Sequence, residues 1–461
     1  ILSCFLNILV PLGRHRNMVE LRILGNYGHY EILTRLQKAQ TVTCSSSKNL
    51  TAISFVRVTF DPTLVEAVQE LLLTTDQEGR CKKWDRIYFH HCRGTINQLI
   101  QVVANANVDQ FYFVADPTHN YATIDSPFPI LSNPTLGQVW FENIVITKDM
   151  GSMMASSIAC HSSLDSISLC HASVENEAIV ELANAFLSNQ HRWKTIRLSK
   201  CQLQDDQLSC LLMALLECTN LSRLFLDGNQ CQDKSLSALS CLLTHDKSSL
   251  ETIDISYQDN GLPRQSFSKM MLLLQKNTTV KTLKLQNNHL NDVELAKISK
   301  LLVQNSTLSH LDIRFNPISS MALQQIIAPN LARYKGLQRL EIRSGVGVLR
   351  QDVLNALQEN IQDNWSLQKL DIFEWDRRLE HVLDLNRSNR KLLQDDTFPL
   401  SLWPRVLDLA MRTTEHHIPS HLRGRKLAQS IACRKASIIF YFLQNSPTIF
   451  VRHPSDPDMV P

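Results

Sequence analysis

The sequence predicts an α/β fold: a curved solenoid with parallel strands on its inner side and helices on its outer side, closed by a helical C-terminal cap. One short pattern, apolar-x-x-apolar-x-apolar, opens eight times between Leu164 and Leu367 at a nearly constant spacing. Each copy is followed by apolar residues at helical spacing. A unit of about 29 residues holds one strand and one returning helix, so the regular spacing predicts a stack of repeats.

The two halves of a repeat have different periods. Residues 205–218 place leucines three and four apart, which is typical of an amphipathic helix. In the next strand Leu224 and Leu226 alternate with polar or aromatic residues, so one face is buried and the other is presented outward. Neither piece can bury its apolar side alone, so we expect neighbouring repeats to stack with their strands about 4.8 Å apart. The eight openings are Leu164, Trp193, Leu221, Leu250, Val280, Leu308, Leu337 and Leu367.

Residues 221–243, 280–307 and 308–326 resemble leucine-rich repeats of the ribonuclease-inhibitor-like class. The resemblance implies a ladder of buried Asn or Cys side chains at the ninth residue of each repeat, where they bind turn backbone groups. The residues expected in this structural ladder are Asn26, Cys92, Cys201, Asn229, Asn288 and Asn316. Other repeats depart from the pattern with Val58, Asp116, Asp149, Ala172, Gln258 and Gly345.

The same pattern continues upstream at a less regular spacing, with openings at Met18, Leu50, Trp84, Val108 and Phe141. We therefore divide the chain into irregular repeats over residues 18–163 and regular repeats over residues 164–380. The apolar residues 1–17 are interpreted as the remnant helix of a preceding repeat. Residues 381–461 are interpreted as the helical C-terminal cap.

The cap is predicted to contain helices over residues 380–393, 400–411 and 427–443. Without a cap, the last repeat would expose its apolar edge to water. The apolar residues expected to cover that edge are Trp403, Leu407, Ile438, Ile439, Phe440 and Phe442. This closing segment resembles that of predicted repeat proteins of unicellular algae, a resemblance that implies no activity.

Composition narrows the class of protein and its partners. The formal net charge is +3, too small to predict binding to nucleic acid or to an anionic membrane. No run of about 18 apolar residues occurs that could cross a bilayer. A chain this long needs no disulfide framework, so its 12 cysteines are expected to be reduced thiols of a cytoplasmic protein. Asn-x-Ser/Thr triplets, such as those at Asn305 and Asn364, are interpreted as turns at helix ends rather than glycosylation sites.

No motif predicts catalysis, a cofactor or a metal site. Histidine and cysteine lie together at His90–His91–Cys92, Cys160–His161 and Cys170–His171, but not at the paired spacing of zinc fingers. The glycines in residues 344–347 lack the lysine and third glycine of a phosphate-binding loop. We therefore expect neither an enzyme nor a small-molecule substrate.

The predicted binding surface is the inner face, formed by the third, fifth and seventh residues of each repeat. Arginine and aromatic side chains, which anchor protein interfaces, are frequent there. The alternative is that strand residues facing water are polar in any case and pair across adjacent strands. The candidate partner-binding residues are Arg197, Arg223, Phe225, Asp227, Asp254, Lys284, His310, Asp312, Arg314, Arg339, Glu341, Arg343, Asp371 and Phe373.

These observations predict a non-enzymatic scaffold that binds a protein partner on its concave face. One alternative is a GTPase-activating regulator of a small GTPase, because activators of the nuclear-transport GTPase also use ribonuclease-inhibitor-like repeats; the match is at the level of fold only. A second is the sensing fragment of a larger receptor or ubiquitin-ligase adaptor.

Overall fold

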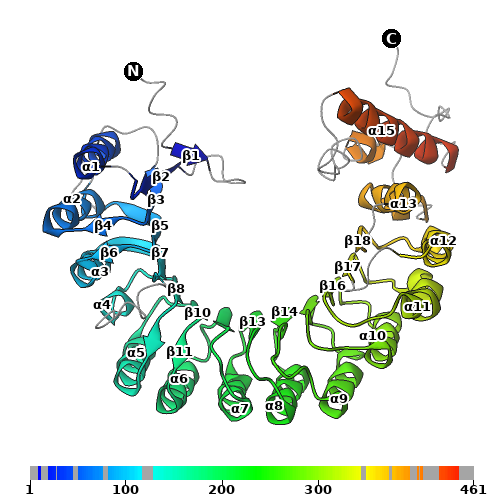
Figure 1. Ribbon diagram of the computed structural model, residues 1–461, viewed down its shortest axis with the longest axis horizontal. Helices are drawn as coiled ribbons and strands as arrows, with labels where there is room; N and C mark the ends of the chain where they lie inside the picture. Colours follow the sequence, from blue (N-terminus) through cyan, green and yellow to red (C-terminus); the bar gives the residue numbers. More distant parts are fainter. Residues whose placement is uncertain are drawn as a thin grey trace, which may run out of the picture. The chain divides into compact units, whose positions relative to one another are not determined.

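The computed structural model describes residues 9–11, 19–26, 28–44, 50–75, 81–116, 128–343, 349–372, 376–394, 402–403, 405–408 and 425–445. The chain divides into two compact units, unit 1 (Ile1–Met270) and unit 2 (Met271–Pro461). In each unit strands and helices alternate along the chain, and Figure 1 shows the strands on one side and the helices on the other. The predicted α/β architecture of parallel strands and returning helices is therefore confirmed.

Unit 1 contains one sheet whose strands follow the order β1-β2-β3-β5-β7-β8-β10-β12-β13-β14. From β2 onward, neighbouring strands are parallel. The short strands β4 and β6, and β9 and β11, form two further parallel pairs. The sheet strands are β1 (Leu9–Pro11), β2 (Val19–Leu24), β3 (Leu50–Val56), β5 (Lys83–His90), β7 (Asn107–Val114), β8 (Gln138–Glu142), β10 (Ser166–Cys170), β12 (Thr195–Ser199), β13 (Arg223–Phe225) and β14 (Thr252–Asp254); the paired short strands are β4 (Thr59–Phe60), β6 (Arg93–Gly94), β9 (Val145–Ile146) and β11 (Ser173–Val174).

The helices of unit 1 return the chain from one strand to the next. Side chains cap several of them: the Asp61 carboxylate accepts from the Leu64 N–H at the start of α2, and the Thr147 hydroxyl accepts from the Met150 N–H at the start of α5. The helices are α1 (His29–Cys44), α2 (Pro62–Leu72), α3 (Ile96–Ala104), α4 (Phe128–Leu131), α5 (Lys148–Cys160), α6 (Asn176–Ser188), α7 (Asp205–Ala214), η2 (Leu215–Glu217), α8 (Asp233–Thr244) and α9 (Arg264–Leu274); the boundary between the units falls within α9.

Unit 2 repeats the arrangement with the parallel strand order β15-β16-β17-β18. Its strands are β15 (Thr282–Lys284), β16 (His310–Asp312), β17 (Arg339–Glu341) and β18 (Lys369–Asp371). Its helices are α10 (Asp292–Gln304), α11 (Ser320–Ala322), η3 (Leu323–Ile327), η4 (Ala328–Arg333), α12 (Gln351–Asn360), η5 (Ile361–Asp363), α13 (Arg377–Arg387), η6 (Arg390–Gln394) and α15 (Arg425–Asn445).

The repeat predicted to open at Phe141 in fact opens at Leu136. Strand β8 pairs with β7 so that Val139 lies opposite Phe111 and Phe141 opposite Phe113. Counted from Leu136, the step back to Val108 and the step on to Leu164 are equal in length. The prediction failed because two buried residues beyond the strand, Ile144 and Ile146, imitate the repeat pattern when it is started at Phe141.

This correction also moves the ninth residue of that repeat from Asp149 to Ile144. Ile144 is fully buried, whereas Asp149 lies in the first turn of α5. The regular spacing of the array therefore begins at Val108, earlier in the chain than the sequence analysis placed it.

In nine of the described repeats the strand is followed by a turn whose eighth repeat residue is left-handed. Its N–H donates to the carbonyl of the seventh residue of the next repeat, as from His171 to Ser199 and from Phe315 to Arg343, both at 2.9 Å. These hydrogen bonds extend the backbone pairing between neighbouring repeats from the strands into the turns that follow them. The left-handed residues, with φ from 48° to 67°, are Arg57, His91, Asn143, His171, Lys200, Gly228, Tyr257, Asn287 and Phe315.

The ninth repeat residue binds backbone groups of its own and the preceding turn. The Asn316 amide donates to the carbonyls of Leu285 and Ile313, both at 2.9 Å, and its oxygen accepts from the Asn288 N–H at 2.8 Å. Asn229 makes the equivalent contacts. The Cys201 and Cys92 thiols donate to carbonyls of the preceding strand, at 3.3 and 3.4 Å.

Two ninth-position residues, Gln258 and Asn26, differ from expectation. Gln258 makes the same contacts as Asn229, with its amide donating to the Leu226 carbonyl and its oxygen accepting from the Cys231 N–H, so this turn does not depart from the pattern. Asn26 is exposed, which is not the environment of a buried ladder residue. Asp116 is paired with Arg93. Gly345 lies outside the described residues.

At the N-terminal end, Leu9–Pro11 form β1, which pairs antiparallel with β2. A helix was predicted there, and the rest of residues 1–17 lies outside the described residues. The failure has a simple reason: apolar residues without a clear period fit a strand as well as a helix.

Near the C-terminus, α13 and α15 enclose a cluster of Leu385, Trp403, Val406, Ile438 and Phe442. Phe440, predicted to cover the last repeat, is 66% exposed because it lies on the opposite side of α15. The function of this segment as a cap stays a prediction.

Candidate binding face

The third, fifth and seventh residues of each repeat point away from the helices, and we call the surface they form the strand face of each unit. In β12, for example, Ile196 and Leu198 are buried between the sheet and the helices, while Arg197 between them faces the other way. The parallel register then places equivalent residues of successive repeats side by side, as for Arg197 and Phe225. Residues one whole repeat apart in the sequence thus become neighbours about 4.8 Å apart.

In unit 1 four of the fifth repeat residues carry rings, and Arg197 lies at the same position between two of them. We call this set the aromatic row: Tyr88, Tyr112, Trp140, Arg197 and Phe225. The ring centroids of Tyr88 and Tyr112 lie 5.9 Å apart, and those of Tyr112 and Trp140 lie 6.2 Å apart. These are distances at which aromatic pairs attract. The three rings are half-buried, so part of each remains available to a ligand.

Arg197 continues the row between two rings. Its guanidinium carbon lies 3.6 Å from the centroid of Phe225 and 5.4 Å from that of Trp140. Strand β10 lies between the strands of Trp140 and Arg197, and its residue opposite both of them is the small, buried Ser168. This leaves room for the guanidinium group of Arg197 to reach Trp140. Phe225 is only 8% exposed, so Arg197 and not Phe225 offers the accessible surface at this end.

Trp140 was not among the predicted binding residues. The register error at Phe141 hid it, because counting from Phe141 assigns Trp140 to no repeat position. The signal was present in the sequence: counted from Leu136, Trp140 falls at the fifth position.

His90 and His91, considered for zinc, stack on each other with ring centroids 3.9 Å apart. Burial lowers the pKa of His90, and the neighbouring His91 lowers it further, so the ring is neutral at pH 7. Burial also raises the pKa of Cys92 to about 12, and its thiol donates hydrogen bonds to carbonyls. A protonated, donating thiol is not arranged as a metal ligand.

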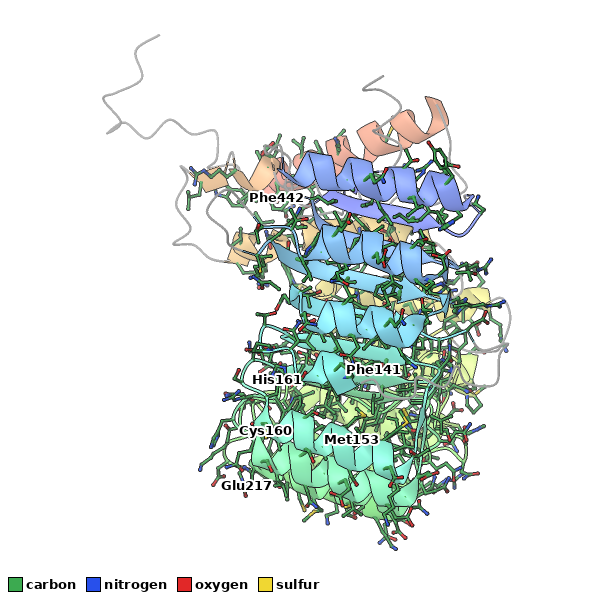
Figure 2. The ribbon with its side chains drawn as sticks, turned by 90° about the vertical axis from the view of Figure 1, so that its left-hand side faces the viewer. Phe141, Met153, Cys160, His161, Glu217 and Phe442 are labelled. Carbon is green, nitrogen blue, oxygen red and sulfur yellow. The ribbon has the colours of Figure 1, made fainter. Side chains whose placement is uncertain are left out.

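In each of the other two His–Cys pairs one residue, His161 or Cys170, is buried within the fold. His161, labelled in Figure 2, holds the turn after α5: its Nε2 lies 2.8 Å from the Asn133 carbonyl, and its Nδ1 accepts from the N–H groups of Ser163 and Leu164. Burial lowers the pKa of His161. Burial also raises the pKa of Cys170 to about 12. The ten cysteines whose side chains the structure describes are all free thiols.

Two of the Asn-x-Ser/Thr sites are buried turns, as predicted. The Asn305 amide donates to the Leu274 carbonyl and its oxygen accepts from the Leu308 N–H. Asn364 makes equivalent contacts and is 1% exposed, so neither side chain is accessible in the folded chain.

In unit 2 the strand face is a network of charges centred on Arg314. Its guanidinium lies 2.6 Å from Asp312, 3.0 Å from Glu341 and 3.9 Å from Asp371. Lys369 lies 2.6 Å from Glu341, and Arg343 lies 2.9 Å from Asp371. The fifth position, aromatic on several strands of unit 1, carries a carboxylate on β16, β17 and β18 and Lys284 on β15.

Burial and pairing act in opposite directions on Asp312. Burial alone would raise the pKa of its carboxyl group, but hydrogen bonds and charge from Arg314, with a hydrogen bond from Gln286, hold the pKa below its ordinary value. The same contacts raise the pKa of Arg314. Both groups are therefore charged at neutral pH and fix each other's position.

His310, Asp312 and Glu341 bring possible metal-ligand atoms within 4.8 Å of one another, a grouping that sequence reasoning missed. The chemistry of the surroundings opposes a cation. Asp312 is paired with Arg314, and Glu341 with both Arg314 and Lys369, so a metal ion would have to displace positive groups already bound. His310 Nε2 is buried without a hydrogen-bond partner, and burial lowers the pKa of its ring.

The remaining predicted residues differ in accessibility. Arg223 is exposed at the start of β13. Asp227 accepts from the Ser199 hydroxyl at 2.6 Å. Asp254 is buried and accepts from the Ser256 N–H, and Lys284 is half-buried on β15. Phe373 lies outside the described residues.

The repeat length, the parallel strands and the turn ladder together define a leucine-rich-repeat protein. Among the described residues, no helix combines the length and the apolar character needed to cross a bilayer.

Two mouse proteins are similar to part of the chain, whereas no protein-family model matches it. NACHT, LRR and PYD domains-containing protein 9C of Mus musculus is 25% identical over 159 residues, which are 34% of this chain and 15% of that protein. Protein 9B of the same series is 22% identical over the same shares. The chain thus spans 15% of the length of these relatives, whose names contain the same repeat class.

Two solved structures are similar at a lower level. The tropomodulin C-terminal domain of Caenorhabditis elegans is 16% identical with a TM-score of 0.30, over 34% of this chain and 97% of that one. A TLR13–ssRNA13 complex is 14% identical with a TM-score of 0.38, over 72% of this chain and 41% of that one.

Proposed function

We propose that this chain is a non-enzymatic, ribonuclease-inhibitor-like scaffold of the cytoplasm that binds a protein partner through its strand face. The observation that carries the proposal is the aromatic row, in which ring contacts and Arg197 link Tyr88 to Phe225 across unit 1. Leucine-rich-repeat relatives and free thiols agree with this proposal. The algal resemblance of the closing segment stays a prediction.

The physical argument rests on composition and preorganisation. Tyrosine, tryptophan and arginine supply most of the binding energy at protein interfaces. Arg197 is already held between two rings and lies 3.9 Å from the Asp227 carboxylate, so binding freezes little further motion in it. A face of rings and a held guanidinium fits a protein surface better than a small substrate.

The test is to recover partners with the tagged full chain, then to measure the affinity of a purified partner for variants. We expect Trp140→Ala to weaken binding about tenfold or more, because a Trp truncated at the centre of an interface costs about 2 kcal/mol. The matched control is Met153→Ala on α5, a 50% exposed residue on the helix side seen in Figure 2.

Two results would contradict the proposal. One is unchanged affinity of Trp140→Ala together with weaker binding of Met153→Ala, which would place the partner on the helices. The other is equal affinity for all variants. Circular dichroism of each variant separates a loss of contact from a loss of folding.

A second candidate function is the sensing part of a larger receptor or ubiquitin-ligase adaptor. The observation that favours it is that the mouse relatives are far longer than the segment they share with this chain. Sequencing the complete transcript tests it, with an effector domain in the same reading frame as the expected result. The GTPase-activator alternative stays a prediction from fold alone.

A further inference from the structure

The strand face of unit 2 has its charges arranged in rows. Its fifth-position row contains the carboxylates of Asp312, Glu341 and Asp371 on neighbouring strands. Each carboxylate has a positively charged residue two positions before or after it in the same repeat, about 6.6 Å along the chain. The third-position row has Arg339 and Lys369, and the seventh-position row has Arg314 and Arg343.

The charges also differ in depth. The carboxylate side chains are 2%, 6% and 14% exposed for Asp312, Glu341 and Asp371. The side chains of Arg339, Arg343 and Lys369 are 49%, 45% and 37% exposed. The acids therefore lie beneath the bases, and an approaching molecule meets the guanidinium and ammonium groups first.

The sum of charges has the same sign as this outer layer. The five positive residues on the face are Lys284, Arg314, Arg339, Arg343 and Lys369; the three negative ones are Asp312, Glu341 and Asp371, which gives 5 − 3 = +2 with His310 neutral. Each carboxylate already has a positive neighbour within 3.0 Å. The excess positive charge faces solvent at a low-dielectric surface, where it attracts anions more strongly than in bulk water.

We propose that this cationic layer, formed by Arg339, Arg343 and Lys369, binds an acidic segment of the protein partner. The proposal rests on the proposed function and names the chemistry of one part of the partner. The carboxylates beneath hold the cationic groups in fixed positions. The cationic groups therefore bind aspartate and glutamate side chains of the partner with little loss of side-chain entropy.

Nucleic acid fits this face less well. Single strands bind through aromatic side chains on which bases stack. The described residues of β15, β16, β17 and β18 contain no Phe, Tyr or Trp.

The experiment uses the full chain and a fluorescent glutamate-rich peptide, with fluorescence anisotropy as the readout. A glutamine peptide of equal length and a single-stranded oligonucleotide of equal charge are the comparison probes. We expect the acidic peptide to bind, its affinity to fall as salt is raised, and the glutamine peptide not to bind. The combined Arg339→Gln, Arg343→Gln and Lys369→Gln variant should bind the acidic peptide about tenfold more weakly.

The matched control removes three exposed lysines elsewhere in unit 2, by Lys276→Gln, Lys300→Gln and Lys335→Gln. This variant has the same net charge as the test variant and should keep its affinity. Equal losses in both variants would mean that only net charge matters, and would overturn the proposal. Tighter binding of the oligonucleotide than of the peptide would overturn it as well.

The result can be separated from the proposed function. If the acidic peptide does not bind but Trp140→Ala still weakens binding of the partner, the inference about the cationic layer is wrong. The proposed function as a scaffold is then unaffected. If Trp140→Ala and the cationic-layer variant both leave the partner unaffected, the strand face is not the binding surface.

Discussion

The fifth repeat residues on three strands of each unit differ in chemistry. In unit 1 it is aromatic at Tyr88, Tyr112 and Trp140, whereas in unit 2 it is acidic at Asp312, Glu341 and Asp371. Within each unit the strands that carry these residues are parallel to their neighbours. The fold thus fixes where a side chain points, and the sequence decides how it interacts.

The difference predicts that the two units respond differently to the loss of one arginine. Arg314→Ala leaves the buried Asp312 carboxylate without its charge partner, so we expect a loss of about 3 kcal/mol in the free energy of unfolding. Arg197→Ala removes a cation–π contact and a 3.9 Å ion pair, for an expected loss of about 1 kcal/mol. Urea unfolding followed by circular dichroism measures both.

Arg333→Ala, on the helix side of unit 2, is the control and should change stability little. Equal losses for Arg314→Ala and Arg197→Ala would show that the buried charges of unit 2 are no more constrained than the ring stack of unit 1. For the same reason Arg314→Ala is a poor probe of partner binding, because it alters the fold.

Acid should act on His161 of unit 1 and on Asp312 of unit 2 in different pH ranges. Burial lowers the pKa of His161, so the neutral ring contributes stability above about pH 6.5, and this stability is lost as the pH falls towards the lower folded pKa. His161→Gln should remove that part of the pH dependence. Urea midpoints measured from pH 7 to pH 5 would show it as a flatter profile.

The pKa of Asp312 is lowered as well, but relative to the ordinary pKa of a carboxyl group, which is below that of histidine. The Asp312 carboxylate contributes stability above about pH 4, and this stability is lost as the pH falls through its lower pKa in the folded state. Asp312→Asn should therefore flatten the profile only below about pH 4. If His161→Gln and Asp312→Asn changed the same pH range, the assignment of these two groups would be wrong.

The smallest expected effects concern the left-handed turn residues, which both units share. Lys200→Gly and Phe315→Gly should each raise the free energy of unfolding by about 0.5 kcal/mol, because glycine accepts a positive φ without a steric cost. Gly228→Ala should lower it by about 1 kcal/mol, since the added Cβ would lie 2.4 Å from the Lys200 Cγ. Thermal unfolding resolves differences of this size, and a destabilised Lys200→Gly variant would contradict the argument.

The sequence was sufficient for the repeat and for most strand positions, because apolar periodicity directly reflects which side chains are buried. The predicted repeat opening at Phe141 was wrong, because buried residues of the turn imitate the pattern of a strand. Trp140 was missed for the same reason. It also could not show that Asp312 and Glu341 are buried beneath basic side chains. Their depth depends on how Arg314 and Lys369, from other strands and turns, fold over them.

The left-handed turn also limits how such a chain can vary in length. The segment from each opening to the ninth residue is bonded to the next repeat by the turn N–H and to the preceding repeat by the ninth-position side chain, so it tolerates no change in residue number. The returning helix has no such fixed count. Insertions and deletions should therefore accumulate only there, as in the unequal steps that separate the openings at Met18, Leu50, Trp84 and Val108. The helix side of each unit can therefore change in length during evolution while the residues of the strand face keep their spacing.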